Sequence, residues 1–277
     1  MKNLTIRFLY NAYRAIFARA GFYSFNSLLY NLSLRGLGIL NYESARMSGE
    51  QHFIASHVPG IEQGVIIDVG ANVGNYSRRL RGSNPDVRIY SFEPHPITFK
   101  KLLENTEGLK VRSFNLGVGN AQGTHMLYDY ADKDGSSHAS MYKDVIEKLH
   151  HGQAVGHEVD VISLDAFVVS EKIDRVGLLK IDTEGHELEV LKGFQQFIMA
   201  NRVDMIHFEF NEMNMTSRVY FKDFWDLLPN YDFYRMLPNG LVPIRRYNPV
   251  LCEIFAYQNI VAKLKKAALG IERGNNT

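Results

Sequence analysis

The stretch Val65-Ile-Ile-Asp-Val-Gly-Ala-Asn-Val-Gly-Asn-Tyr-Ser77 is an apolar strand that ends in an acid and runs through a glycine-containing turn into a helix. A second apolar segment, Ile89-Tyr-Ser-Phe-Glu93, also ends in an acid, and Glu93 follows Asp68 by 25 positions, close to one βαβ unit. Two such strands are typical of a doubly wound fold that binds a nucleoside. The pair therefore indicates an enzyme with a nucleoside cofactor.

The turn between strand and helix indicates which cofactor. Gly70 and Gly74 let the backbone approach a ligand closely, because a Cβ at either position would occupy that space. A dinucleotide turn reads G-x-G-x-x-G, whereas this turn has Asn72 in the middle and Asp68 beside it. A carboxylate repels a pyrophosphate and attracts a cation. S-adenosylmethionine carries an ammonium and a sulfonium and no phosphate, so it fits better.

Glu93 supplies the second half of the predicted cofactor site. An acid at the end of the second strand can accept hydrogen bonds from both ribose hydroxyls. Each signal alone also occurs in purely structural turns. Together, with a helix between them, they favour a nucleoside cofactor over a structural turn.

The chain after this segment alternates strands with helices, which predicts an α/β fold. Strands are expected at residues 65–68, 87–92, 111–115, 177–181, 203–210, 233–237 and 250–257. The alternation predicts a doubly wound, mostly parallel, seven-stranded Rossmann-like sheet with helices on both faces. The turn Pro238-Asn-Gly240 indicates that the last strands are antiparallel. We assign this domain to residues 61–277.

Residues 1–60 are predicted to form an N-terminal helical extension. The first 42 residues contain five basic residues and many aromatic and aliphatic ones, and the first acid is Glu43. The longest uncharged stretch, residues 20–34, is too short and too polar for a bilayer span, and no secretory cleavage site follows it. The helices are expected to pack on the catalytic domain and cover the cofactor. The alternative is peripheral contact of residues 1–42 with an anionic membrane surface, such as the inner face of the cell membrane.

Composition excludes some classes of partner. The 277-residue chain has a net charge of +1, so no overall field attracts nucleic acid. Cys252 is the one cysteine and lies in an apolar run, so it is expected to be a buried thiol in a cytoplasmic protein.

The alternation is interrupted at residues 124–160, an insertion that holds five of the ten histidines and the small polar run Gly135-Ser-Ser-His-Ala-Ser140. Long insertions at this point of an α/β sheet tend to be functional, and we expect a flap that contacts the acceptor. The histidine spacing matches no zinc signature, and there is no second cysteine, so no metal site is assigned.

A second cluster of reactive residues is Leu178-Leu-Lys-Ile-Asp-Thr-Glu-Gly-His-Glu187. An apolar strand ends at Asp182, and Glu184 and His186 follow before a helix, on the same edge of the sheet as Asp68 and Glu93. Alternation along residues 204–210 puts His207 and Glu209 on one face, with Glu209 nearest that edge. His207 lies in mid-strand and is expected to be a hydrogen-bonded core histidine.

The chain resembles the FkbM family of S-adenosylmethionine-dependent methyltransferases. The resemblance rests on five motifs in this order: IIDVGANVGNYS, YSFEPHP, NLGVGN, LKIDTEGHELEVLKGF and HFEFNE. The resemblance covers about residues 65–211. It implies O-methylation of a hydroxyl of a sugar, a surface glycan or a related natural product. Both a free and a lipid-linked acceptor are compatible with this hypothesis. It also implies that Asp68, Gly70, Asn72 and Glu93 contact the cofactor, with Asn115 near the adenine and Asp182 near the transferred methyl.

Methyl transfer to a hydroxyl needs near-attack geometry and a general base. His186 and Glu184 are the preferred candidates for the base, and Asp182 is assigned to orientation of cofactor and acceptor. The same carboxylates can alternatively hold a divalent cation that binds two acceptor hydroxyls. Two other functions stay open: an NAD-dependent oxidoreductase, and a non-catalytic cofactor-binding protein with a membrane-surface arm.

Overall fold

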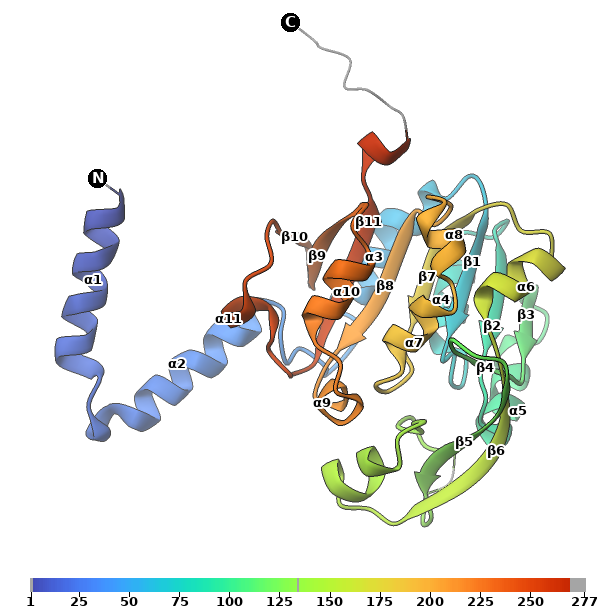
Figure 1. Cartoon of the computed structure of the whole chain (residues 1–277), viewed down its shortest axis with the longest axis horizontal. Helices are drawn as coiled ribbons and strands as arrows, with labels where there is room; N and C mark the ends of the chain where they lie inside the picture. Colours follow the sequence, from blue (N-terminus) through green and yellow to red (C-terminus); the bar gives the residue numbers. More distant parts are fainter. Residues whose placement is uncertain (1, 134, 270–277) are drawn as a thin grey trace, which may run out of the picture.

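The centre of the protein is an eight-stranded sheet, as seen in a computed structural model that describes residues 2–133 and 135–269 (Figure 1). In spatial order, the strands are β10 (Gly240–Ile244), β9 (Tyr231–Leu237), β11 (Gln258–Leu264), β8 (Met205–Phe210), β7 (Val176–Ile181), β1 (Val65–Val69), β2 (Arg88–Phe92) and β3 (Val111–Phe114). The strands from β8 to β3 are parallel, and β11, β9 and β10 are joined by antiparallel pairing. The predicted α/β class and antiparallel end are confirmed.

The order of the strands indicates at which edge of the sheet a ligand is expected to bind. β1 lies between β2 and β7, so the chain first builds the sheet outward on one side of β1 and then returns to its other side. Open α/β sheets bind ligands beyond the carboxyl ends of the strands at such a switch point. β1, β2 and β7 end at Val69, Phe92 and Ile181, immediately before or near the predicted site residues.

The far end of the sheet differs from the sequence prediction. There are eight strands rather than seven, because β10 forms a hairpin with β9 around Pro238 and Asn239. The strand predicted at residues 250–257 is wrong: α11 (Pro249–Cys252) begins there, and the last strand is β11, farther along the chain. The helix starts because the Asn248 side chain accepts a hydrogen bond from the Val250 N–H (3.0 Å) and Pro249 suits the first helical position. Cys252 is buried, as predicted.

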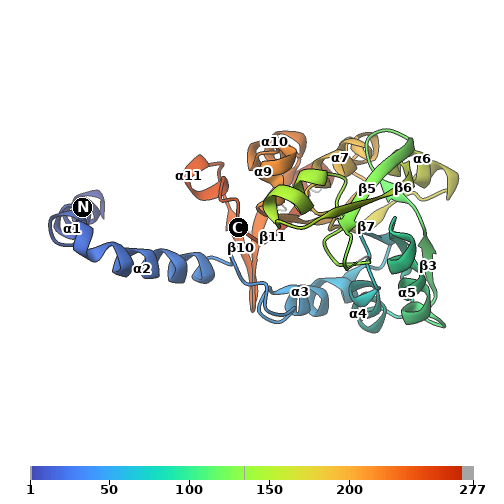
Figure 2. The same ribbon diagram turned by 90° about the horizontal axis from the view of Figure 1, so that it is seen from below.

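Helices cover both faces of the sheet (Figure 2). On one face lie α3 (Glu50–His57), α4 (Asn75–Ser83) and α5 (Pro96–Thr106), and on the other lie α6 (Leu164–Ser170), α7 (Glu187–Lys192), α8 (Gln195–Met199), α9 (Met213–Ser217) and α10 (Phe221–Leu227). Side chains alternate between the two faces along the buried strands: Ile66 packs in one cluster with α3 and α4, whereas Ile67 packs in the other with α6, α7, α8 and α10. α3 therefore shares a core with the sheet.

The helix predicted after His186 is two helices, α7 and α8, with Gly193 between them. A Cβ at Gly193 would lie 2.0 Å from the Gly119 carbonyl oxygen, so the backbones meet closely at the break. The large apolar side chains on the inner side of this segment are all buried: Val190, Leu191, Phe194, Phe197 and Ile198.

The insertion and the short segment before it form a second, three-stranded sheet of β4 (Gly117–Val118), β6 (Ala154–Ile162) and β5 (Gly123–Tyr130). A π-helical turn, Val145–Leu149, lies between β5 and β6. Figure 1 shows this green and yellow hairpin curving below the carboxyl ends of the central strands.

The N-terminal helices do not cover the domain. Three elements project away from the sheet (Figure 1): α1 (Lys2–Phe17), a short 3₁₀ turn (Ala20–Phe22) and α2 (Tyr23–Gly36). The expectation that they pack on the catalytic domain is therefore wrong for α1 and most of α2. Most of their large apolar side chains are exposed, for example Leu4 (77%) and Tyr23 (75%), whereas Leu34 near the end of α2 is buried. Among the described residues, no helix has the length and hydropathy to cross a bilayer.

Candidate active site

A cavity of about 490 Å³ opens at the carboxyl ends of β1, β2, β7 and β8 and is bounded on the other side by residues 136–141 of the insertion. Six of the nine predicted site residues line it: Gly70, Asn72, Glu93, Asp182, Glu184 and His186. The other three, Asp68, Gly74 and Asn115, are not among the lining residues. The structure thus brings residues 70–93 and residues 182–186, which are far apart in the sequence, to one cavity.

Gly70 joins these two segments. Its φ is +76°, and a Cβ would lie 1.7 Å from the Asp182 carbonyl oxygen. The Asp182 N–H donates to the Val69 carbonyl (3.0 Å), so the end of β7 is locked against the end of β1. The sequence predicted that Gly70 makes room for a ligand. The structure shows that it makes room for the backbone of Asp182.

Asp68, Gly74 and Asn115 shape the site from behind the cavity wall. Asp68 is buried and accepts a hydrogen bond from the Ser77 hydroxyl (2.6 Å), and burial raises the pKa of Asp68 to about 6. Gly74 has a φ of +85°, and a Cβ there would meet the Leu102 side chain at 2.8 Å. The Asn115 amide donates to the Glu93 and Pro94 carbonyls, each at 2.9 Å. These contacts hold the turn and the loop that face the cavity.

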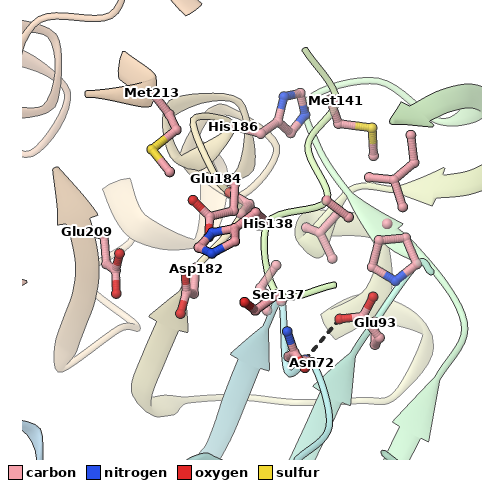
Figure 3. Close-up of a pocket in the computed structure, with 18 of the residues that line it drawn as sticks. Asn72, Glu93, Ser137, His138, Met141, Asp182, Glu184, His186, Glu209 and Met213 are labelled. Carbon is pink, nitrogen blue, oxygen red and sulfur yellow. Dashed lines mark hydrogen bonds and ion pairs between the residues drawn. The ribbon is translucent and has the colours of Figure 1, made fainter. Parts of the chain in front are cut away.

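Glu93 is the acidic residue that directly follows β2. Its carboxylate accepts hydrogen bonds from the Asn72 N–H (2.9 Å; Figure 3) and the His95 N–H (2.8 Å). Asn72 has a φ of +50°, which turns its N–H toward this carboxylate. Burial raises the pKa of Glu93 to about 7, and the two backbone donors oppose that rise. Each carboxylate oxygen has a further lone pair with which to accept a ligand hydroxyl.

A buried cation lies under the opposite side of the cavity. The Lys180 ammonium is 3.4 Å from Asp182 and 3.8 Å from Glu209. Burial alone would lower the pKa of Lys180, but the carboxylates around it, Asp182 foremost, outweigh burial and raise it. Burial raises the pKa of Glu209 well above its usual range. Lys180 therefore stays charged and holds Asp182 at the cavity wall.

The turn after β7 carries Glu184 in a left-handed conformation, with a φ of +51°. Glu187, the first residue of α7, folds its carboxylate back onto this turn and accepts hydrogen bonds from the N–H groups of Thr183 and Gly185, both at 3.1 Å. Glu187 is therefore a positioning residue for the loop that bears Asp182 and Glu184.

His138, which the sequence did not assign to the site, is paired with Glu184. Its Nδ1 is 3.3 Å from the Glu184 carboxylate, and the two side chains meet in the middle of the cavity (Figure 3). Burial raises the pKa of Glu184 to about 7, and the hydrogen bond with Glu184 raises the pKa of His138. The only signal in the sequence was the small polar run Gly135–Ser140, in which His138 is the one titratable residue.

The loop that carries His138 is held at both ends. Asp129, buried at the end of β5, accepts hydrogen bonds from the N–H groups of Gly135 and Ser136, both at 2.8 Å. At the other end, the Ser140 hydroxyl donates to the Glu184 carbonyl (2.7 Å). The insertion thus presents His138 in a fixed position.

His186 lies apart from this pair. In Figure 3 it stands beside Met141, away from Asp182 and Glu209. Its Nδ1 is buried without a hydrogen-bond partner in the described part of the chain, and burial lowers the pKa of His186 to about 4. His207 is the satisfied core histidine that the sequence predicted, bonded to Tyr76 (3.0 Å) and Asn259 (2.8 Å).

The cavity is acidic. Five carboxyl side chains line it, from Glu93, Asp182, Glu184, Glu209 and Glu212, and no Lys or Arg is among the described residues that line it. The remaining surface is apolar and hydroxyl-bearing, with Leu116, Val118 and Ser137 as examples. Such a cavity attracts a cationic, hydroxyl-rich ligand and repels a phosphate.

Comparison with known proteins assigns the part of the chain that contains this site to a protein family. The profile of the Methyltransferase FkbM domain matches residues 68–234, which contain all nine predicted site residues. The hexuronic acid methyltransferase AglP of Haloferax volcanii is 29% identical over 172 residues, 61% of this chain and 64% of AglP. The match thus spans less than two thirds of the length of that relative.

Two further proteins are similar. The 2-O-methyltransferase NoeI of Sinorhizobium fredii is 23% identical over 189 residues, 64% of this chain and 76% of NoeI. The crystal structure of Methyltransferase FkbM from Methylobacillus flagellatus superposes with a TM-score of 0.42 and 14% identity, over 72% of this chain and 43% of that one.

Proposed function

This chain belongs to the FkbM family of methyltransferases, and from that premise we propose that it uses S-adenosylmethionine to methylate a hydroxyl group of a sugar, a surface glycan or a related natural product. The observation that carries the proposal is the acidic cavity at the switch point of the sheet, lined by five carboxyl groups and no described Lys or Arg.

The residues of the cavity suit S-adenosylmethionine better than a dinucleotide. When bound, this cofactor supplies a methyl group on a positively charged sulfur. Glu93 would accept the ribose hydroxyls, and Asp182 would face the positive charge of the cofactor. The pyrophosphate of NAD would meet the same carboxylates and be repelled, which disfavours the oxidoreductase alternative.

Glu184 is the best-placed general base. A carboxyl with a pKa near 7 is ionised in part at neutral pH and can take the proton of an acceptor hydroxyl. His138 bonds and orients this carboxylate. His186 accepts a proton weakly, because its pKa is about 4. We therefore assign the proton transfer to Glu184, positioned by His138, and not to His186.

Two relatives support methylation of a hydroxyl group, and one of them supports a sugar acid as the acceptor. AglP is a hexuronic acid methyltransferase and NoeI is a 2-O-methyltransferase. In this chain, Ser137 of the insertion lines the same cavity as the five carboxyl side chains, which suits an acceptor with several hydroxyl groups.

Calorimetric titration of the full chain tests the choice of cofactor. S-adenosylhomocysteine is expected to bind, and NAD⁺ is not, because the carboxylates repel its phosphates. Tight binding of NAD⁺ without S-adenosylhomocysteine would contradict the proposal. Methyl transfer from S-adenosylmethionine to extracted glycans, followed by mass spectrometry for the added methylene mass, then identifies the acceptor.

The affinity for S-adenosylhomocysteine is expected to rise with pH and to level off above about pH 7. Ribose hydroxyls bind the ionised Glu93 carboxylate, whose pKa is about 7, so below that pH binding must first release a proton. Affinity should fall about tenfold per pH unit below 7. Glu93→Gln should bind more weakly and lose this dependence, whereas Glu184→Gln should keep it. A dependence that persists in Glu93→Gln would assign it to another group.

A further inference from the structure

The N-terminal arm, defined here as residues 2–36 with α1 and α2, has charges of one sign. Its charged residues are all basic: Lys2, Arg7, Arg14, Arg19 and Arg35. Arg35 is paired with Glu43, which lies just beyond the arm, at 2.5 Å. The arm therefore presents a positive surface that extends away from the methyltransferase domain (Figure 1).

The arm also has exposed apolar faces at helical spacing. On α1, an apolar row recurs every three or four residues and is exposed throughout: Ile6 (45%), Leu9 (59%), Tyr13 (40%) and Ile16 (54%). Arg7, Asn11 and Arg14 lie on a different side of the same helix, at their own spacing of four and three. On α2, Phe25, Leu28 and Leu32 continue the pattern and are exposed. An amphipathic basic helix of this kind is typical of a membrane surface.

The two helices are joined in a defined shape. At the elbow, Phe17 contacts the rings of Tyr13, Phe22 and Phe25, with centroids 5.0, 5.2 and 5.4 Å away. The Asn26 amide donates to the Phe17 carbonyl (2.9 Å). The arm is thus a bent unit with its own small aromatic cluster, not two independent helices.

We propose that the N-terminal arm lies in the plane of an anionic lipid bilayer, with its apolar rows among the acyl chains and its arginines at the headgroups. Transfer of the exposed Leu, Ile and aromatic side chains out of water supplies the hydrophobic part of the binding. The headgroups supply the negative charge that the arm lacks. A second copy of the arm would bring together two positive surfaces, which disfavours self-association.

The root of the arm links it to the active site. After α2, the Leu40 N–H donates to the Tyr257 carbonyl (2.8 Å), and the rings of Tyr42 and Tyr257 meet edge to face at 6.1 Å. Both tyrosines line the cavity. Docking of the arm therefore holds the cavity close to the lipid surface.

Vesicle flotation of the full chain tests this proposal and is independent of methyl transfer. The chain is expected to float with phosphatidylcholine–phosphatidylserine vesicles, far less with phosphatidylcholine alone, and less as salt is raised. Leu9→Asp with Ile16→Asp should weaken vesicle binding about a hundredfold. Arg7→Gln with Arg14→Gln should weaken it by roughly tenfold or more.

Matched changes on the methyltransferase domain serve as controls. Val169→Asp with Met199→Asp puts the same two charges at residues that are 77% and 49% exposed on α6 and α8, and Arg78→Gln with Arg88→Gln removes the same two charges from exposed positions. Both should float like the wild type. The proposal is overturned if the wild type stays unbound, if Leu9→Asp/Ile16→Asp floats equally well, or if light scattering shows a dimer that this variant abolishes.

Discussion

Replacing Glu184 by glutamine is expected to slow methyl transfer by about 10²–10⁴-fold, the usual contribution of a general base. Glutamine keeps the shape of the side chain but cannot take a proton. S-adenosylhomocysteine should still bind, because the Glu93 carboxylate and the turn at Gly70 are untouched. The wild-type rate should rise with pH as Glu184 ionises near its pKa of about 7, and Glu184→Gln should lack this rise.

Replacing His138 by alanine distinguishes the role of His138, which orients Glu184, from the role of Glu184 in proton transfer. The hydrogen bond from His138 lowers the pKa of Glu184, and burial raises it. Without His138, Glu184 should ionise only at higher pH. The variant should therefore be slow at neutral pH and recover in part at alkaline pH, which a purely structural defect would not do.

Steady-state rates across the pH range, with calorimetry for binding, check both variants. His186→Ala is the discriminating control, since His186 also lines the cavity but stands apart from Glu184. It should retain most of the activity. If His186→Ala loses the pH-dependent rate and Glu184→Gln keeps it, the base is His186 and our assignment fails.

Gly70→Ala is expected to cause the largest loss of stability, about 3 kcal/mol or more in the free energy of unfolding. The added Cβ would lie 1.7 Å from the Asp182 carbonyl oxygen, a backbone atom that cannot move without separating β1 from β7. The φ of +76° adds strain for any residue with a Cβ. Binding of S-adenosylhomocysteine should be lost as well, because the displaced strands carry the cavity wall.

Urea unfolding monitored by circular dichroism measures this loss. Gly82→Ala is a matched control: no atom lies within 4 Å of its added Cβ, and the residue is in α4. That change should be neutral or stabilise by up to about 1 kcal/mol, because alanine favours a helix. Equal stability of Gly70→Ala and wild type would mean that the two strand ends can separate freely.

Local patterns in the sequence predicted much of the fold and some of the site. Strands such as β1 and β7 are buried and mostly apolar, and acids stand at or just after their ends, where a buried strand gives no structural reason for them. Parallel strands bring those ends to one edge, so Glu93, Asp182 and Glu184 were predicted to gather there. The apolar run at residues 250–257 misled the prediction, since Asn248 and Pro249 start a helix in it.

The sequence by itself determined which residue types stand at the strand ends and the acidic character of the cavity, on which our proposal for the cofactor rests, because these follow from local periodicity and strand order. Only the tertiary structure decided that His138 pairs with Glu184, that the Asp68 carboxylate is bonded to Ser77 behind the cavity wall, and that the N-terminal arm stands free. The physical reason is that each of these depends on which distant surfaces meet. A loop held by Asp129 can reach Glu184 only after both sheets have formed, and no local pattern records that contact.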